Sequence, residues 1–339
     1  MSDSLVLITG GSGHVGFRVL VEALRQGYRV RAAVRSESKA RAIQDARSIQ
    51  PYTNALSFII VPDILEKGAY DDAVKDVDYI IHVASPIGAS AGDYEENIVM
   101  PAVQGTLGIL YSALSQPSIK RVIITSSAAA VAPDNPEVTF TSDNLVPDAN
   151  GPYETYRAAY RASKVLAYNR TRDFITSKNP HFTIINIMPS VVIGENELAT
   201  TTTSIYSGTN TYMLAPVLGI HISDPRPGFT CHLDDVAYVH VAALRVQTES
   251  HQNFAVNASI EGIDYNDAIR IVQKRFPKEI EQGIFPLGGH VEALRVRFDA
   301  SRTEDVFKIK FKPFEEQVVS VAQAYVDVFK KQTENQMPH

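Results

Sequence analysis

The chain of 339 residues has little cysteine and no tryptophan. Its only cysteine is Cys231. A single thiol cannot close an intramolecular disulfide, so nothing in the sequence indicates an oxidising compartment. Cys231 also has no charged neighbour in the sequence that would favour a thiolate, so we do not expect a reactive cysteine.

Long hydrophobic runs and blocks of basic residues are missing as well. The longest apolar stretch, 184–194, is interrupted by Asn186, Pro189 and Ser190 and is too short to cross a bilayer. The glycine-rich segment that begins at Gly10 leaves no room for a signal peptide before it. The formal net charge is −6, with no basic stripe for a nucleic acid. We therefore expect a cytoplasmic protein that binds a small molecule, with neither nucleic acid nor a membrane as partner.

Short apolar runs alternate with amphipathic stretches through the first two-thirds of the chain. The runs predict strands at 5–9, 29–34, 56–61, 79–83, 121–125 and 182–188, and the stretches between them include helices at 15–26, 97–115 and 156–176. Continuous apolar strands separated by helices are typical of parallel sheets covered on both faces. Because such crossovers are right-handed, the sequence predicts an α/β fold with a doubly wound parallel sheet.

The pattern loosens after Pro189 and becomes rich in threonine, serine and proline. It returns as a predicted helix at 233–246 and a strand at 254–256, and the chain closes with a predicted helix at 315–330. We therefore predict a larger sheet domain of residues 1–189 plus 231–258. A smaller interleaved C-terminal lobe, 190–230 plus 259–339, is expected to bind the substrate.

Three glycines, Gly10, Gly13 and Gly16, follow the first predicted strand and open the first predicted helix. Lacking a Cβ, Gly10 can turn tightly, Gly13 lets a pyrophosphate approach the backbone, and Gly16 lets helix and strand lie close together. The phosphates would sit at the helix N-terminus, where N–H groups and the helix dipole favour negative charge. In this strand-before, helix-after context the glycines predict a dinucleotide site, and so a Rossmann domain.

The end of the second strand indicates which dinucleotide is bound. NAD-specific sites carry an acidic residue there, whereas this chain has Arg35, followed by Lys39 and Arg41. A guanidinium can hold a 2′-phosphate bidentately, a contact of about 1.5–3 kcal/mol, or roughly ten- to a hundredfold in affinity. The sequence therefore favours NADPH, although Arg35 would also fit a solvated surface. Asp63, after the third strand, could accept a hydrogen bond from the adenine amino group or cap the next turn.

A tyrosine and a lysine four residues apart, Tyr160 and Lys164, share one face of a predicted helix. Such a pair is weak evidence alone, because it arises often by composition. Ser126 and Ser127 follow the fifth strand, at the sheet edge where ligands bind in open α/β folds, although serines there also serve as ordinary turn residues. Residues 82–86 end the fourth strand at the same edge.

Because of these motifs, the chain resembles an extended short-chain dehydrogenase/reductase. The resemblance rests on Thr9-Gly10-x-x-Gly13-x-x-Gly16, the serine after strand five and Tyr160-x-x-x-Lys164. Finer motifs are similar to the dihydroflavonol reductase-like branch, and within it to the fungal NADPH-dependent aldehyde and carbonyl reductases. These motifs are the segments 30–35, 82–86 (His-Val-Ala-Ser-Pro), 125–127, 160–164, 179–183 and 232–236. The likeness is weakest between 195 and 228.

The resemblance implies reduction of a carbonyl group by hydride transfer, with Tyr160 as proton donor. An ammonium ~4 Å away at an effective dielectric of ~20 favours phenolate by about 4 kcal/mol, so Lys164 is expected to lower the pKa of Tyr160 by about three units. Ser127 would hold the carbonyl oxygen. Family members place the catalytic serine second in the pair, but the residues alone leave Ser126 and Ser127 open.

The resemblance also implies the residues that line the cofactor and the substrate. The expected cofactor-binding residues are Gly10, Ser12, Gly13, His14, Val15, Gly16, Arg35, Lys39, Asp63, Ile64, Val83, Ala84, Ser85, Tyr160, Lys164, Pro189, Ser190, Val191 and Val192. The expected substrate-binding residues are Ser85, Pro86, Ser127, Tyr160 and Tyr206, with Tyr212 and Met213 as further wall candidates. The substrate itself is not specified, and a monomer and a homodimer are both compatible with the sequence.

Two other functions compete with a reductase. A nucleotide-sugar epimerase or dehydratase would usually carry an asparagine where this chain has Ala102. After strand six it would usually carry an arginine with a Tyr-Gly segment, where this chain has the apolar segment 189–194. A non-catalytic dinucleotide sensor would tend to lose the tyrosine, which is present. We also expect no metal site, with Asp234 capping the helix that begins there, and His82 as a satisfied core histidine.

Overall fold

The structure is a computed structural model that describes residues 4–85, 93–248 and 250–336. The chain divides into two compact units, each assembled from separate segments. The first comprises Met1–Pro133, Ser142–Met188 and Ala237–Ala255, and the second comprises Asp134–Thr141, Pro189–Val236 and Val256–His339. The two units thus alternate along the chain, and the short stretch Asp134–Thr141 belongs to the second unit.

The first unit is built on a seven-stranded sheet. Its strands are β1 (Leu5–Thr9), β2 (Arg29–Val34), β3 (Leu56–Ile60), β4 (Tyr79–His82), β5 (Arg121–Thr125), β6 (Thr183–Pro189) and β10 (Gln252–Val256). Their order is β10-β6-β5-β4-β1-β2-β3, and every pair from β6 to β3 is parallel. Strand order reverses between β1 and β4, where open α/β sheets bind ligands. The predicted doubly wound Rossmann sheet is confirmed.

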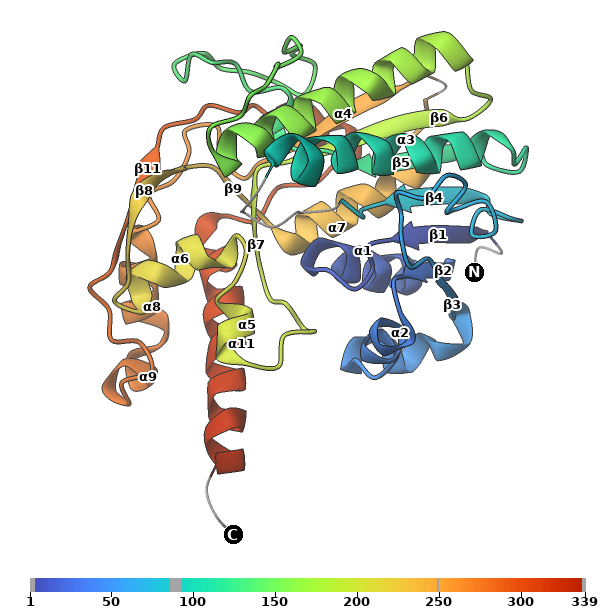
Figure 1. The fold of residues 1–339 in the computed structure, drawn as a ribbon. Helices are drawn as coiled ribbons and strands as arrows, with labels where there is room; N and C mark the ends of the chain where they lie inside the picture. Colours follow the sequence, from blue (N-terminus) through green and yellow to red (C-terminus); the bar gives the residue numbers. More distant parts are fainter. Residues whose placement is uncertain (1–3, 86–92, 249, 337–339) are drawn as a thin grey trace. The chain divides into compact units, whose positions relative to one another are not determined.

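The helices of the first unit connect these strands. They are α1 (His14–Arg25), α2 (Glu37–Gln44), α3 (Met100–Leu114) and α4 (Tyr156–Lys178), with the short turns η1 (Arg47–Ala55), η2 (Glu95–Val99), η3 (Ala128–Ala130) and η4 (Ala243–Arg245). Helix α7 (Leu233–Ala242), which precedes η4, begins in the second unit and continues into the first from Ala237. Figure 1 shows α3 and α4 together on one face of the sheet and α1 on the other. That is the outcome of right-handed crossovers that run in opposite directions from β1.

Helix α4 carries the predicted Tyr160–Lys164 pair, and its ends are fixed locally. The Thr155 hydroxyl accepts a hydrogen bond from the N–H of Ala158, so it caps the helix N-terminus. At the other end Asn179 adopts a left-handed conformation with φ 43°, a common helix stop. The helix therefore starts one turn before Tyr160, which fixes the face on which the tyrosine and the lysine project.

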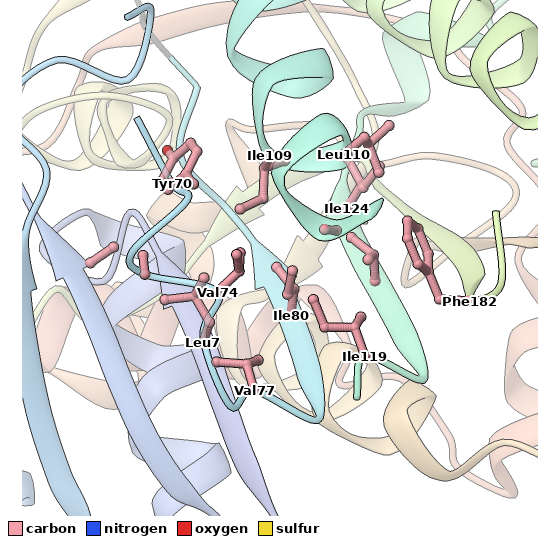
Figure 2. Packing of buried hydrophobic residues seen from close by; sticks show 14 of the residues in the cluster. Leu7, Tyr70, Val74, Val77, Ile80, Ile109, Leu110, Ile119, Ile124 and Phe182 are labelled. Atoms are coloured by element: carbon pink, nitrogen blue, oxygen red, sulfur yellow. The ribbon is translucent and has the colours of Figure 1, made fainter. Parts of the chain in front are cut away.

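The core of the first unit lies between the sheet and α3 (Figure 2). Leu7, Ile80 and Ile124 contribute from the strands, and Ile109 and Leu110 from α3, each no more than 4% exposed. Burying each such side chain stabilises the fold by about 1.5–3 kcal/mol. This core holds the carboxyl ends of β1, β4 and β5 at one edge, where the predicted site residues follow.

One helical stretch, Glu95–Leu114, is long and apolar enough to span a membrane on length and hydropathy alone, with a mean hydropathy of 1.2. Half of that stretch is buried inside the protein. It includes α3, whose Ile109 and Leu110 belong to the core in Figure 2. The apolar character of this stretch is accounted for by packing against the sheet.

The second unit contains two small parallel sheets and a helical core. Its strands β7 (Val191–Ile193) and β9 (Thr230–His232) pair with each other, as do β8 (His221–Pro227) and β11 (His290–Leu294). Its helices are α5 (Thr202–Ile205), α6 (Asn210–Val217), α8 (Asp267–Arg275), α9 (Pro277–Glu281), α10 (Ser301–Phe307) and α11 (Phe314–Gln336). Buried side chains of α6, α8 and α11 form its hydrophobic core.

Candidate active site

The glycine loop between β1 and α1 has the geometry that a dinucleotide needs. Gly10 has φ +72°, and a Cβ there would lie 2.6 Å from the backbone nitrogen of Ala84. A Cβ on Gly16 would overlap the carbonyl oxygen of Gly10, whereas a Cβ on Gly13 would meet only ordinary contact at 3.4 Å. Gly10 and Gly16 are therefore required by the fold. Gly13, at the exposed N-cap of α1, leaves the approach to the helix terminus open for a phosphate.

The remaining predicted cofactor residues in the first unit lie around this loop and at the ends of neighbouring strands. Arg35, directly after β2, and Lys39, on α2, are exposed and make no ion pair within the described part of the chain. Asp63 accepts a hydrogen bond of 2.8 Å from the N–H of Leu65, so the turn-capping alternative is present. Half-buried positions are occupied by Ser12, His14, Val15, Ile64, Val83, Ala84 and Ser85.

The structure brings three of the predicted catalytic side chains together. Ser127 follows β5 in extended conformation, and its hydroxyl accepts a hydrogen bond of 3.1 Å from the N–H of Ala129. Its side chain lies close enough to Tyr160 to act on the pKa of the tyrosine. Lys164 lies one turn beyond Tyr160 on α4, with its Nζ 5.6 Å from the centre of the tyrosine ring. Nζ donates a hydrogen bond of 3.1 Å to the hydroxyl of Ser85, after β4.

The two serines after β5 have different surroundings, which the sequence could not show. The N–H of Ser126 donates to the carbonyl oxygen of Ile187 at 2.8 Å, as a continuation of the sheet, and its side chain lines a small cavity beside Lys164. Ser127 is the serine whose side chain acts on the pKa of Tyr160. The geometry therefore favours Ser127 over Ser126 as the partner of the tyrosine.

The electrostatics differ from the expectation drawn from the sequence. Burial raises the pKa of Tyr160, and the hydrogen bond from Ser127 only partly opposes that effect. Burial also lowers the pKa of Lys164 to about 8. The expected lowering of the Tyr160 pKa toward neutrality by Lys164 is therefore wrong for this structure, because removal of the phenolate from water is the largest effect on that pKa.

Only one of the two ring nitrogens of His82, at the end of β4, has a hydrogen-bond partner among the described residues. Its Nδ1 hydrogen-bonds to the Thr9 hydroxyl at 2.8 Å, and that hydroxyl accepts from the N–H of Ala84 at 3.2 Å. Its Nε2 is buried and has no hydrogen-bond partner among the described residues. Burial, helped by the nearby charge of Lys164, lowers the pKa of His82 to about 3, so the ring is neutral. The expectation of a fully satisfied core histidine was wrong.

Several predicted residues belong to the second unit. The N–H and hydroxyl of Ser190 both donate to the carbonyl oxygen of Val256, at 2.9 and 3.2 Å, and Val191 lies in β7. Pro189 ends β6 and Val192 is buried in β7. Tyr206 is partly buried, which raises the pKa of its hydroxyl. Their roles toward cofactor and substrate stay predictions.

One predicted substrate-wall residue lies in the protein core, and another is not described by the structure. Met213 is fully buried in the hydrophobic core of the second unit, so its interpretation as a wall residue was wrong. Pro86 lies outside the described residues.

The segment 232–236 has a structural role. Asp234 does not cap α7 as predicted; its carboxylate pairs with the Lys312 ammonium at 2.6 Å. The N–H of Asp234 instead donates to Nδ1 of His232 at 3.0 Å. Asp235 accepts from the N–H of Lys312 at 2.8 Å. Within the described residues, no three histidine, cysteine or acidic side chains gather as a metal site would require.

A doubly wound sheet with this glycine loop, and with a serine, a tyrosine and a lysine at its carboxyl edge, defines a nicotinamide-dependent oxidoreductase. Residues 6–258 match the model of the NAD dependent epimerase/dehydratase family. The chain belongs to this family, the extended short-chain dehydrogenases/reductases, as its motifs predicted.

Curated relatives cover nearly the whole chain. The "Ketoreductase CTB6" of Cercospora nicotianae is 37% identical, over 98% of this chain and 97% of that protein. The "Aldehyde reductase 2" of Sporidiobolus salmonicolor is 27% identical, over 91% of each chain. The similarity therefore includes both units rather than the sheet alone.

Solved structures share the fold. Gre2 of Candida albicans, in a complex with NADPH, has a TM-score of 0.80 and 23% identity, over 96% of this chain and 99% of that chain. Vestitone reductase from alfalfa (Medicago sativa) has a TM-score of 0.73 and 20% identity, with 96% and 99% covered. At these identities the match shows a common architecture only.

Proposed function

We propose that this protein reduces an aldehyde or a ketone to an alcohol at the expense of NADPH, with Tyr160 as the proton donor. The observation that carries the proposal is the cluster at the carboxyl edge of the sheet. There the Ser127 side chain lies close enough to Tyr160 to lower its pKa in part, and Lys164 follows one helical turn later, with its Nζ 5.6 Å from the centre of the tyrosine ring. A phenol, a hydroxyl donor and a cation beside a dinucleotide loop are the groups that carbonyl reduction requires.

Bound NADPH would supply the hydride, and the protein's residues would control the proton. Burial raises the pKa of Tyr160, so its oxygen keeps a proton at neutral pH and can donate it to the carbonyl oxygen. The Ser127 hydroxyl donates a second hydrogen bond to the same oxygen, where negative charge develops. The Lys164 ammonium, buried beside the tyrosine ring, then stabilises the phenolate that proton donation leaves behind.

The preference for NADPH is supported by charge. Arg35 and Lys39 lie exposed just beyond β2, where a 2′-phosphate would bind, and make no ion pair with any residue that the structure describes; no acidic residue occupies that strand end. The Gre2 structure with NADPH, which shares the fold, agrees with this preference. We propose that the cofactor is bound by the residues that the sequence predicts. Among them, Gly10, Gly13 and Gly16 lie below the phosphates, and Val83, Ala84 and Ser85 follow β4.

The substrate class follows from the site and from the relatives. A ketoreductase and an aldehyde reductase stand among the similar proteins, and both printed activities are carbonyl reductions. Ser85 and Ser127 supply polar contacts to the substrate, and Tyr206 and Pro86 belong to its proposed surroundings. We further propose a cytoplasmic location and a monomeric or homodimeric state, as the sequence suggested.

The direct test is NADPH consumption by the purified protein against a panel of aldehydes, diketones, aryl ketones and flavanonols. UDP-sugars form the negative arm, since an epimerase or dehydratase would convert them. We expect oxidation of NADPH with at least one carbonyl class and no change in the UDP-sugars. Conversion of a UDP-sugar without carbonyl reduction would overturn the proposal.

A further inference from the structure

A small cavity with both polar and apolar walls lies in the first unit beside Lys164. Its volume is about 20 Å3, and its walls come from β4, β5, α3 and α4. The lining includes His82, Ser85, Ala102, Thr106, Thr125, Ser126, Lys164, Tyr168, Thr171 and Asn186. A space of this size accommodates a single water molecule, provided that several polar atoms face it.

Most polar side chains of this cavity have partners elsewhere. The Thr106 hydroxyl donates to the carbonyl oxygen of Ala102 at 2.9 Å, and the Thr125 hydroxyl hydrogen-bonds to His240 at 2.8 Å. Among the lining residues that the structure describes, His82 is the one with a fully buried polar atom that has no partner. It is 2% exposed, its Nδ1 is engaged by Thr9, and its Nε2 has no partner within the described part of the chain. An unpaired nitrogen in the interior destabilises the fold unless a water reaches it.

Lys164 offers the complementary group. Its ammonium has three N–H donors, and Ser85 accepts one of them at 3.1 Å. Both Lys164 and His82 line the same cavity. A water placed there can accept from the ammonium and, according to which tautomer the neutral imidazole adopts, donate to or accept from Nε2.

We propose that this cavity is a binding site for one ordered water, hydrogen-bonded to Nε2 of His82 and to Nζ of Lys164, and that His82 is a positioning residue for Lys164. The water site stands by itself, whereas its effect on turnover rests on the proposed function. Ala102, on α3, contributes only a methyl group to the lining and so leaves room for the water.

The expected consequence is electrostatic. A water oxygen that accepts from the ammonium stabilises the charged form, so it keeps the pKa of Lys164 higher than burial alone would. The titratable groups that face Lys164 are His82 on β4, and Tyr160 and Tyr168 on its own helix. The cavity-lining residues of α3 and β5 do not ionise near neutral pH. Removal of the water should therefore lower the pKa of Lys164.

Two substitutions of His82 separate its two nitrogens. His82→Asn keeps an amide near the Nδ1 position, for the bond to Thr9, and removes the group at Nε2. His82→Gln places an amide near Nε2 and restores the contact with the water. The pKa of Lys164 can be followed by NMR of 13C-labelled lysine, assigned with Lys164→Arg. We expect a fall of about one unit in His82→Asn, and a value within about half a unit of wild type in His82→Gln.

A second route avoids any change at His82. Ala102→Val extends into the cavity and should displace the water while the Thr9–His82 bond remains, and so lower the pKa of Lys164 in the same direction. A crystal structure of the protein should show a water within hydrogen-bond distance of both Nε2 and Nζ. A dry cavity, or an unchanged Lys164 pKa in both His82→Asn and Ala102→Val, overturns the proposal. Neither readout requires turnover, so this failure is distinct from failure of the reductase assignment.

Discussion

At the scale of single residues, burial raises the pKa of Tyr160, so the side chain is a phenol at neutral pH, and Ser127 is the serine that acts on that pKa. That protonation state suits donation to a carbonyl oxygen and so favours the reductive direction at neutral pH. The sequence could predict the pair Tyr160 and Lys164 from their spacing. It could not choose between Ser126 and Ser127, because the choice depends on how the chain turns after β5, where Ser127 becomes the cap of a short helical turn.

The pH dependence of the reaction should follow Lys164. Burial lowers the pKa of its ammonium to about 8, so the charge is present below that pH and is lost as the pH rises through it. We expect kcat/KM for carbonyl reduction to be level below about pH 7 and to fall above pH 8. Initial rates across pH 6–10 at low substrate concentration provide the test. A profile that stays level to pH 10 would show that the ammonium is not needed.

Arg35 should decide between the two dinucleotides. Removal of its guanidinium in Arg35→Ala should raise KM for NADPH by roughly ten- to a hundredfold, and change KM for NADH by less than about threefold. Arg29→Ala is the matched control, because Arg29 is an exposed arginine at the opposite end of the same strand. Equal effects of Arg35→Ala on both cofactors would return Arg35 to the role of a solvated surface residue.

At the scale of elements, two glycines of the β1–α1 loop are expected to serve different purposes: Gly16 the stability of the fold, and Gly13 the binding of NADPH. Gly16→Ala places a methyl group against the carbonyl of Gly10, and should lower the free energy of unfolding by about 1–3 kcal/mol. Gly13→Ala has room in the protein and should change stability by less than about 0.5 kcal/mol. It should nevertheless raise the Kd for NADPH at least tenfold, since its methyl group lies where the pyrophosphate approaches.

Denaturant titration and fluorescence titration with NADPH measure these two effects. The interpretation would be wrong if Gly13→Ala unfolded as easily as Gly16→Ala, or if it bound NADPH as tightly as wild type.

The beginning of α7 is tied to the segment before α11 through Asp235. Burial raises the pKa of this carboxyl group to about 6, although the hydrogen bond that it accepts from the Lys312 N–H opposes the shift. A folded-state pKa above the unfolded value means that folding loses stability as the pH rises from about 4 to 6. Asp235→Asn stays neutral and still accepts from Lys312, so above pH 6 it should be more stable than wild type by roughly 2–3 kcal/mol.

Denaturant unfolding at pH 4, 5, 6 and 7 tests this difference, with the exposed Asp305→Asn as control. A stability difference that does not grow with pH, or that appears equally in the control, would contradict the burial of a charged Asp235.

At this scale, the elements that could be predicted are those with a clear local sequence pattern. The bounds of β1, β2 and β5 were predicted to the residue, because each is a short apolar run between clear turns. Strand β8, His221–Pro227, was missed: it contains aspartate, arginine and two prolines, and its pairing with β11 joins segments about seventy residues apart. Asp234 was misread for the same reason, since its partner Lys312 is 78 residues away in sequence.

At the scale of the whole molecule, the two units differ in how much chemistry the sequence reveals. The sheet unit repeats one pattern of strand and helix, so its fold, its glycine loop and the placement of the Tyr160–Lys164 pair on one helix could all be inferred. The second unit has short elements whose burial follows distant contacts, such as Met213 in the core with α8 and α11. Substrate choice is expected to lie there, so the sequence predicts a carbonyl but not which one.

The most direct test of the central claim is Tyr160→Phe, assayed with whichever carbonyl compound the wild-type protein reduces. NADPH oxidation is followed under single-turnover conditions, and NADPH affinity by fluorescence titration. Loss of the donor proton should slow hydride transfer by about 10²–10⁴-fold, with the Kd for NADPH within about threefold of wild type. Reduction within tenfold of the wild-type rate would contradict the assignment of Tyr160 as the proton donor.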